Sequence, residues 1–294
     1  MTSQKFLISG LGSIGQRHYK NLKQLGYDQL AVFRTGQGQN QPFVNKFIGE
    51  FKPQVHTDLD EALGERPTAV FITNPTSLHV PTALKAARAG CHLFIEKPLS
   101  HTLDGTDDLA GLARRHNLIV YVGYHWRFNP VIRQIKNWLE AGLVGKVTGV
   151  SAALGELVSE WHPWEDYRTS YACRKDLGGG VILTQSHELD YLYWLFGPVE
   201  KVAAFGGKLS GLELEVEDTV KIIMQFKSGV VASVNLDYLQ KPSRRELRVV
   251  GTKGRIEADL VSSGALFLPA DGSDKLVYRA PADFERNAVY LDEL

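Results

Sequence analysis

The stretch FLISGLGSIGQRHYKNL, residues 6–22, decides the fold of the first half of this chain. Three apolar residues and Ser9 lead into a turn containing Gly10, Gly12 and Gly15, and a basic, amphipathic segment follows. In such a turn the first glycine permits the tight bend, the second lets the backbone approach a pyrophosphate, and the third lets helix and strand pack closely. The N–H groups at the start of the helix favour an anion. The stretch predicts a strand, a phosphate-binding turn and a helix; the alternative is a glycine-rich turn without a ligand.

Short apolar runs recur through the first 124 residues, and each is continuous rather than alternating. Continuous runs are typical of strands buried on both faces of a parallel sheet. Helical patterns lie between them, one over residues 79–89 that ends at Gly90 and one over residues 102–116 that begins with Thr102. This alternation predicts an open, doubly wound α/β sheet. The expected strands are residues 6–9, 30–33, 68–73, 92–96 and 118–124.

The second half has a different pattern. We expect helices over residues 130–141 and about 180–196, whereas most of the remaining sequence is strand-like. Turn-like sequence such as KSG at 227–229 joins neighbouring segments, which indicates a mostly antiparallel sheet. The division is therefore a Rossmann domain, residues 1–124, and an α+β domain with a large open sheet, residues 125–294. Its expected strands are residues 146–154, 199–209, 218–226, 229–239, 245–251 and 254–260.

Composition excludes several classes of protein. The 33 basic residues of the 294 balance 33 acidic ones, which argues against a nucleic-acid partner. No apolar run is long enough to span a membrane, and the N-terminus leads directly into a strand without a signal-peptide pattern. Cys91 and Cys173 have no metal-ligand spacing, and no metal is expected. Two cysteines suit a reducing cytoplasm; a single disulfide between them is the disfavoured alternative.

Arg34 and Thr35 follow the second expected strand, about 20 residues after the glycine turn, where an acid would bind the ribose hydroxyls of NAD. An arginine at this place suits a 2′-phosphate, because it can form charge-assisted hydrogen bonds and stack on adenine. The sequence thus favours NADP over NAD. The alternative is a solvated loop arginine.

Five motifs in order give the chain a family resemblance. They are GLGSIGQRH at 10–18, TNPTSLH at 73–79, EKP at 96–98, GYHWRFNP at 123–130 and the stretch from Trp161 to Gly197. Together they resemble the Gfo/Idh/MocA family, the oxidoreductases related to glucose–fructose oxidoreductase and inositol dehydrogenase. The last stretch is most similar to the branch that acts on sugars in bacterial polysaccharide pathways. The resemblance implies a sugar-like substrate and a homodimer or homotetramer formed through the C-terminal sheet.

The resemblance also implies roles for individual residues. Lys97 would hydrogen-bond the substrate oxygen, and His187 would exchange the hydroxyl proton. Residues implied near the substrate are Tyr167, Arg168, Tyr171, Asp190 and Arg127. Those implied at the NAD(P) cofactor are Gly10, Gly12, Ser13, Ile14, Gly15, Arg34, Thr35, Thr73, Asn74, Pro75, His79, Glu96 and Lys97.

Several of these residues have structural alternatives. Asp190 either orients His187 or completes a local polar network. Arg127 either faces a ligand or forms an interdomain salt bridge, and His79 either contacts the cofactor or caps its own helix. Trp161 and Trp164 either stack on a sugar or form a buried aromatic cluster.

The sequence departs from the family pattern at two places. Thr184 stands where many members carry an acid before the histidine, which leaves Lys97 and His187 with most of the chemistry. Family members usually continue for some tens of residues beyond Leu294, adding helices that return to the first domain. Either those helices are absent from this sequence or the protein is naturally short; if they are missing, apolar surface of the first domain would be exposed.

The sequence thus predicts an oxidoreductase that transfers hydride between nicotinamide and a secondary hydroxyl or keto carbon of a sugar, cyclitol or sugar nucleotide. One alternative is a glycosidase that oxidises its substrate transiently and re-reduces it. The other is a dinucleotide-binding sensor without turnover.

Overall fold

The computed structural model describes residues 4–36, 41–162 and 165–294. The chain forms two compact units. One comprises Met1–Gly123, Thr169–Gly179 and Leu294, and the other comprises Tyr124–Arg168 and Gly180–Glu293. The segment Thr169–Gly179 therefore belongs with the first unit, although it follows the start of the second in the sequence.

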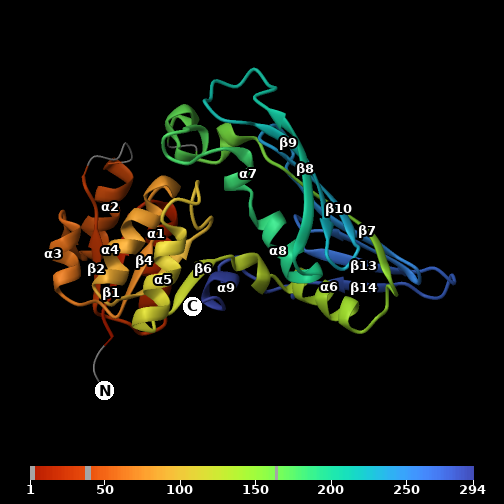
Figure 1. Cartoon of the computed structure of the whole chain (residues 1–294), viewed down its shortest axis with the longest axis horizontal. Coiled ribbons are helices and arrows are strands. Elements are labelled where there is room, and N and C mark those ends of the chain that lie inside the picture. The colour runs from red at the N-terminus through yellow and green to blue at the C-terminus, as the bar shows by residue number, and fades with distance from the viewer. Residues whose placement is uncertain (1–3, 37–40, 163–164) are drawn as a thin grey trace. The chain divides into compact units, whose positions relative to one another are not determined.

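The first unit contains a parallel sheet with the strand order β3-β2-β1-β4-β5-β6 (Figure 1). This order confirms the predicted doubly wound sheet, because the chain starts at the centre and winds outward in both directions. The short edge strand β3 is absent from the predicted runs, since its three residues form no apolar run. The strands are β1 Phe6–Ser9, β2 Leu30–Phe33, β3 Gln54–His56, β4 Ala69–Ile72, β5 His92–Glu96 and β6 Val120–Gly123.

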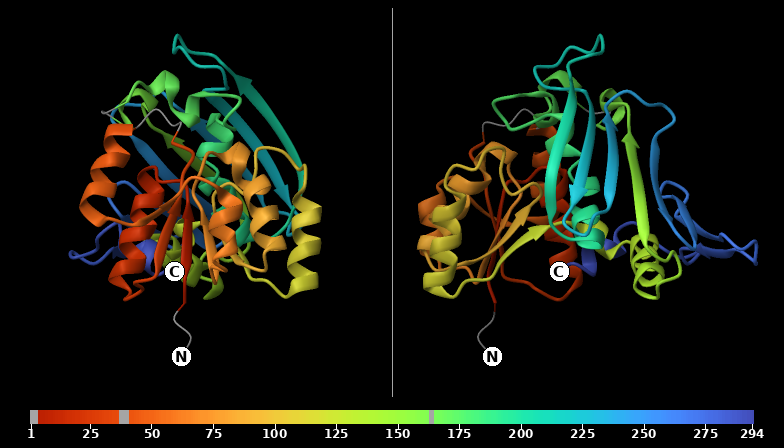
Figure 2. Two further views of the ribbon diagram at one scale, coloured as in Figure 1. Left: turned by 90° about the vertical axis from the view of Figure 1, so that its left-hand side faces the viewer. Right: turned by 45° about the vertical axis from the view of Figure 1, so that its right-hand side comes forward.

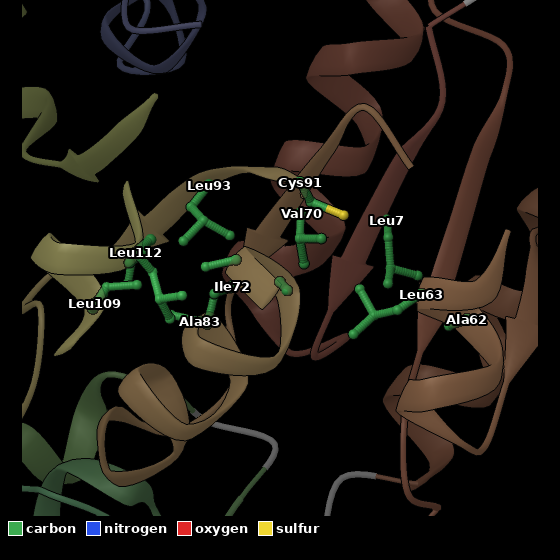
Figure 3. Close-up of a cluster of buried hydrophobic side chains, with 13 residues drawn as sticks. Leu7, Ala62, Leu63, Val70, Ile72, Ala83, Cys91, Leu93, Leu109 and Leu112 are labelled. Carbon is green, nitrogen blue, oxygen red and sulfur yellow. The ribbon is translucent and has the colours of Figure 1, made fainter. Parts of the chain in front are cut away.

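Helices cover both faces of this sheet, which explains why its central strands read as continuous apolar runs. Alternate residues of β1 point to opposite cores: Leu7 packs into one cluster and Ile8 into the other. Figure 3 shows the first cluster, with β-strand side chains such as Val70 and Leu93 against leucines and alanines from the helices. The helices are α1 Ser13–Gln24, α2 Gln41–Phe51, α3 Leu59–Gly64, α4 His79–Arg88 and α5 Thr106–His116, with 3-10 turns at Thr76–Leu78 and Tyr171–Cys173.

The predicted start of the helix at Thr102 was wrong. Residues 102–105 form turns, and α5 begins only after Gly105, whose φ of +74° lies in the left-handed region that glycine adopts without strain. Leu103, expected on the apolar face, is 86% exposed. The helix over 79–89 is confirmed within one residue, with Gly90 at φ +80° after its end.

The second unit contains a sheet with the strand order β14-β13-β12-β11-β7-β10-β9-β8. Every neighbouring pair is antiparallel except β10 with β7, so the predicted mostly antiparallel sheet is confirmed. The expected strands did not include β13 and β14. The bounds are β7 Val147–Gly155, β8 Val199–Gly207, β9 Thr219–Phe226, β10 Val231–Asp237, β11 Arg244–Gly251, β12 Gly254–Asp259, β13 Gly264–Pro269 and β14 Leu276–Arg279.

Among the described residues, the long helices of this unit contact one face of the sheet (Figures 1 and 2). The single helix predicted over about 180–196 is two helices, because Gln185 leaves helical geometry (φ −101°, ψ 27°) and its side chain donates to the Asp237 carbonyl. No described helix is both long and apolar enough to cross a membrane. The helices are α6 Pro130–Glu140, α7 Val181–Thr184, α8 His187–Phe196 and α9 Ala288–Leu291, with 3-10 turns at His125–Phe128, Val158–Glu160 and Tyr167–Thr169.

Candidate active site

The glycine turn between β1 and α1 is tightly packed on one side and open on the other. A Cβ on Gly15 would lie 2.1 Å from the Gly10 carbonyl oxygen, so only glycine allows α1 to pack this closely on the turn. Gly10 has φ +103°, and a Cβ there would lie 2.6 Å from the Asn74 nitrogen. At Gly12, by contrast, a Cβ would meet nothing within 4 Å. The turn is therefore closed toward the protein and open at Gly12, the N-cap residue of α1.

The start of α1 offers backbone N–H donors, and no acidic side chain of its first turn would compete with a bound anion. Gly12 provides no side-chain cap for α1, and the first turn of the helix contains no acidic residue. Ser13 and Ile14 are its first two residues. N–H groups at a helix start have no partner within the helix and attract an anion.

The residues after β4 hold the turn in place. The Thr73 hydroxyl donates to the carbonyl of Gly10 at 2.6 Å and to that of Ser9 at 3.1 Å. Asn74 donates from its side-chain amide to the Thr82 hydroxyl at 2.9 Å, and Pro75 precedes the 3-10 turn that leads into α4. Thr73 thus acts on the predicted cofactor site by fixing the turn.

Lys97 follows the carboxyl end of β5, where open α/β sheets bind ligands. Glu96, the last residue of β5, is buried and accepts through Oε1 from His18 of α1 at 2.7 Å. His79 at the start of α4 is also buried, with Nδ1 2.8 Å from the Pro98 carbonyl oxygen and Nε2 2.8 Å from that of Asn74. Burial lowers the pKa of His79, although both carbonyl contacts oppose this shift. Its ring therefore bridges two loops instead of capping its own helix.

Arg34 lies directly after β2, as expected, and is half-buried. Its guanidinium donates to the side-chain oxygens of Gln41 and Asn45, both in α2. Both partners are neutral amides, so these contacts leave the positive charge of the guanidinium uncompensated. Thr35 next to it is exposed.

In the second unit, His187 is the first residue of α8 and is 6% exposed. Three consecutive aromatic residues, Tyr124 and the first two residues of the 3-10 turn His125–Phe128, lie around its ring. The centroid distances from His187 are 4.4 Å to His125, 5.7 Å to Tyr124 and 6.5 Å to Trp126. His125 in turn stacks on Tyr290 at 4.1 Å.

Arg127 and Asp190 form one bidentate salt bridge. Arg127 Nε donates to Asp190 Oδ2 at 2.9 Å, and its Nη2 donates to Oδ1 at 2.6 Å. Both residues belong to the second unit, so this bridge is local to that unit. It uses both carboxylate oxygens of Asp190, which agrees with a local polar network better than with a direct bond to His187.

Thr184 stands at the position where many family members carry an acidic residue before the histidine, and its hydroxyl forms local hydrogen bonds. Its hydroxyl donates to the Gly180 carbonyl at 2.7 Å and hydrogen-bonds the hydroxyl of the fully buried Tyr238. Trp161 also packs edge-to-face on Tyr238, with centroids 5.3 Å apart, as the aromatic-cluster alternative expects. Trp164 lies outside the described residues.

The predicted substrate residues Tyr167, Arg168 and Tyr171, which precede the glycines at 178–180, lie at or near the surface. Arg168 is exposed, and its guanidinium binds the carboxylates of Asp166 and Glu213 at 2.6 and 2.9 Å. The Tyr167 hydroxyl accepts from the Glu213 N–H at 3.2 Å. Tyr171, which belongs to the first unit, is 36% exposed. Arg168 and Tyr167 thus connect their own segment to the loop around Glu213.

Sequence reasoning missed a buried ion pair next to His187. Glu188 is fully buried, and Arg245 of β11 donates to it from Nε at 2.7 Å. The Arg245 guanidinium also lies over the Trp126 ring, 3.4 Å from its centroid. Burial raises the pKa of Glu188, while the charge of Arg245 opposes this shift. Because the partners are 57 positions apart, no local pattern pairs them. His18 and His125 were missed for the same reason.

Two further features concern the possible metal ligands and the cysteines. In the part of the chain that the structure describes, no group of three or more His, Cys, Asp or Glu residues is arranged to hold a metal ion. Cys91 and Cys173 are both buried and are not joined in a disulfide.

The wound parallel sheet, the glycine turn closed by Gly10 and Gly15, and the open helix start define a dinucleotide-binding Rossmann protein. Comparison with known families agrees. Residues 4–124 match the family described as "Oxidoreductase family, NAD-binding Rossmann fold", and residues 132–257 match the "GFO/IDH/MocA C-terminal domain". The chain therefore belongs to the GFO/IDH/MocA oxidoreductase family.

Individual relatives are distant. The chain is 27% identical over 282 residues to a myo-inositol 2-dehydrogenase of Thermotoga maritima, covering 91% of this chain and 79% of that one. It is also 27% identical over 301 residues to a 2,7-anhydro-N-acetylneuraminate hydratase of Mediterraneibacter gnavus, covering 99% and 77%. The WlbA dehydrogenase of Bordetella pertussis, solved with NADH and UDP-GlcNAcA, has a similar fold (TM-score 0.76, 24% identity, 87% of this chain and 77% of that one).

Proposed function

We propose that the chain is an NAD(P)-dependent oxidoreductase acting on a secondary hydroxyl or keto carbon of a sugar, cyclitol or sugar nucleotide. The glycine turn carries this proposal, because it is closed toward the protein and open at Gly12. Residues 1–124 would hold the dinucleotide, and residues 125–294 would supply most of the substrate contacts. Two observations support this substrate class. The second half resembles the polysaccharide branch of the family, and the similar proteins include an inositol dehydrogenase and a dehydrogenase solved with a sugar nucleotide.

The residues around the turn fit a dinucleotide. N–H groups of Ser13, Ile14 and Gly15 would bind the pyrophosphate, and Asn74 with Pro75 would border the nicotinamide half. When bound, the nicotinamide supplies the hydride acceptor or donor.

The protein's own contribution is the handling of protons and charge. We propose that His187 accepts the hydroxyl proton of the alcohol, or returns it in the reverse direction. Lys97 would donate a hydrogen bond to the substrate oxygen and stabilise its developing negative charge. The aromatic residues around His187 fix its ring, and the bridge to Arg127 holds Asp190 on the same helix.

The experiment that tests this function is a screen of sugars, cyclitols and sugar nucleotides with each cofactor, read by NAD(P)H absorbance. Turnover with any of them supports the proposal.

A hydratase adds or removes water without net oxidation, so the hydratase among the relatives makes transient oxidation a specific second candidate. Product formation without net NAD(P)H change would select that candidate, and tight dinucleotide binding without any product would select the sensor.

We further propose that the cofactor is NADP, because the Arg34 guanidinium is held by two neutral amides of α2 and keeps its charge for a 2′-phosphate. Titrating tryptophan fluorescence with NADPH and NADH should show tighter NADPH binding. Arg34→Ala should weaken NADPH binding by about tenfold or more, while NADH binding changes little. Equal binding of both cofactors by the wild type would contradict this preference.

We also propose a cytoplasmic homodimer or homotetramer formed through the large sheet. The face away from the helices is hollowed over β7, β11, β12, β13 and β14, with a cavity volume of about 680 Å³. Arg244, Arg248 and Arg279 line this hollow together with Glu246 and Glu257, a mixed charge pattern that suits a self-complementary contact. Sedimentation equilibrium should give at least twice the chain mass, and Arg248→Glu should lower it. A monomer at all concentrations would contradict the proposal.

A further inference from the structure

Two buried histidines of the first unit hold the main chain on either side of Lys97. On one side, His18 Nε2 lies 2.7 Å from Glu96 Oε1, and the other carboxylate oxygen of Glu96 accepts from the N–H of Lys97 at 3.2 Å. The carboxylate thus connects the His18 ring to the Lys97 peptide. His18 is completely buried and packs against the rings of Phe71 and Phe94, at centroid distances of 5.6 and 4.9 Å. Its position is therefore fixed by packing.

On the other side, His79 contacts the residue that follows Lys97. Its Nδ1 lies 2.8 Å from the Pro98 carbonyl oxygen and its Nε2 lies 2.8 Å from the Asn74 carbonyl oxygen, and the ring is 2% exposed. A neutral imidazole has one N–H, so it donates to only one of these carbonyls at a time. Because burial favours the neutral ring, the tautomer decides whether His79 binds the Lys97 loop or the loop after β4.

Both histidines are also connected to the phosphate-binding turn, His18 directly and His79 through Asn74. His18 lies in α1, the helix that begins after Gly12. Asn74, the other partner of His79, passes so close to Gly10 that a Cβ on that glycine would lie 2.6 Å from its nitrogen. A shift of the turn on binding an anion would therefore reach residue 96 through the His18–Glu96 hydrogen bond, and residue 98 through the buried His79 ring, which lies between the Asn74 and Pro98 carbonyls.

We propose that His18 and His79 are positioning residues that connect the dinucleotide turn to the Lys97 loop and set the environment of the Lys97 ammonium. This inference rests on the proposed role of Lys97. Neither histidine needs to touch cofactor or substrate, because each acts through the chain next to Lys97. The bond that matters at His79 is the one from Nδ1 to Pro98.

The test measures the reactivity of Lys97 and needs no substrate. Trace acetylation with acetic anhydride, read by mass spectrometry over a pH series, gives the rate and pH midpoint for the peptide containing Lys97. In the wild type, saturating NADH or NADPH should slow this acetylation by about fivefold or more. His18→Leu and His79→Gln should lose most of that protection at saturation, and should move the pH midpoint without cofactor by about half a unit or more.

Conservative variants separate positioning from folding. The glutamine amide of His18→Gln reaches the place of Nε2 and keeps the bond to Glu96, so wild-type behaviour is expected. At His79, asparagine reaches the place of Nδ1 and keeps the bond to Pro98, whereas glutamine keeps only the bond to Asn74. We therefore expect His79→Asn to resemble the wild type and His79→Gln to differ. If the two His79 variants behave alike, or if His18→Leu matches the wild type, the inference is wrong.

His92→Leu is the matched control, because His92 lies at the opposite end of β5 and its Nδ1 accepts from the Ile119 N–H at 3.0 Å. It should leave Lys97 reactivity unchanged. Failure of the proposed function has a different signature: wild-type protein that binds dinucleotide without any protection of Lys97. The pH midpoint without cofactor still tests the positioning in that case.

Discussion

Gly12→Val should weaken dinucleotide binding by about a hundredfold, roughly 2.8 kcal/mol, while leaving the folded chain as stable as the wild type. Gly12 has φ −69° and ψ −170°, a conformation that any residue adopts, and a Cβ there meets nothing within 4 Å. The side chain would occupy only the space through which a pyrophosphate reaches the helix start. Fluorescence titration gives the affinity, and thermal unfolding without cofactor gives the stability.

Gly15→Ala is the contrasting variant, because its Cβ would lie 2.1 Å from the Gly10 carbonyl oxygen. This smaller substitution should destabilise the chain by about 1–3 kcal/mol, since helix and turn must separate. If Gly12→Val lowers stability as much as Gly15→Ala, the space at Gly12 serves packing and not a ligand. Unchanged affinity in Gly12→Val would contradict the phosphate-binding turn itself.

Lys97→Met and His187→Ala should each reduce turnover of the substrate found in the screen by about 10²–10⁴-fold. Methionine keeps most of the volume of the lysine stem but cannot donate to the substrate oxygen, and alanine at 187 removes the proton acceptor. Binding of the dinucleotide should fall far less than turnover in both variants, because the pyrophosphate contacts are made at the turn and not by these side chains. Steady-state kinetics and fluorescence titration measure the two effects separately.

Lys85→Met is the matched control for Lys97. Lys85 is an exposed residue of α4 whose ammonium pairs with Asp60 at 2.9 Å, so its loss should leave turnover nearly unchanged. If both Lys97→Met and His187→Ala keep turnover within a few-fold of the wild type, the assignment of the chemistry to these residues is wrong.

The sequence predicted the sheets best where the pattern is local. The runs at residues 6–9, 30–33 and 92–96 agree with β1, β2 and β5 residue for residue, because strands buried on both faces form mainly continuous apolar runs. The prediction of helix bounds from the sequence failed where the backbone geometry depends on a single residue. Gly105 delays the start of α5, and Gln185 separates α7 from α8 through a bond to a distant carbonyl.

For the candidate site, the sequence by itself determined the residue types and their order. Gly10, Gly12 and Gly15, the lysine after β5 and the histidine of α8 are all visible as motifs, because close backbone approach, charge and proton exchange each require particular residues. What only the tertiary structure decided is how these residues are held. The pairs His18–Glu96, His79–Pro98, Arg127–Asp190 and Glu188–Arg245 join residues 19 to 78 positions apart. Such pairs form only when separate elements pack together, since a buried polar group needs a partner and the fold determines which one it meets.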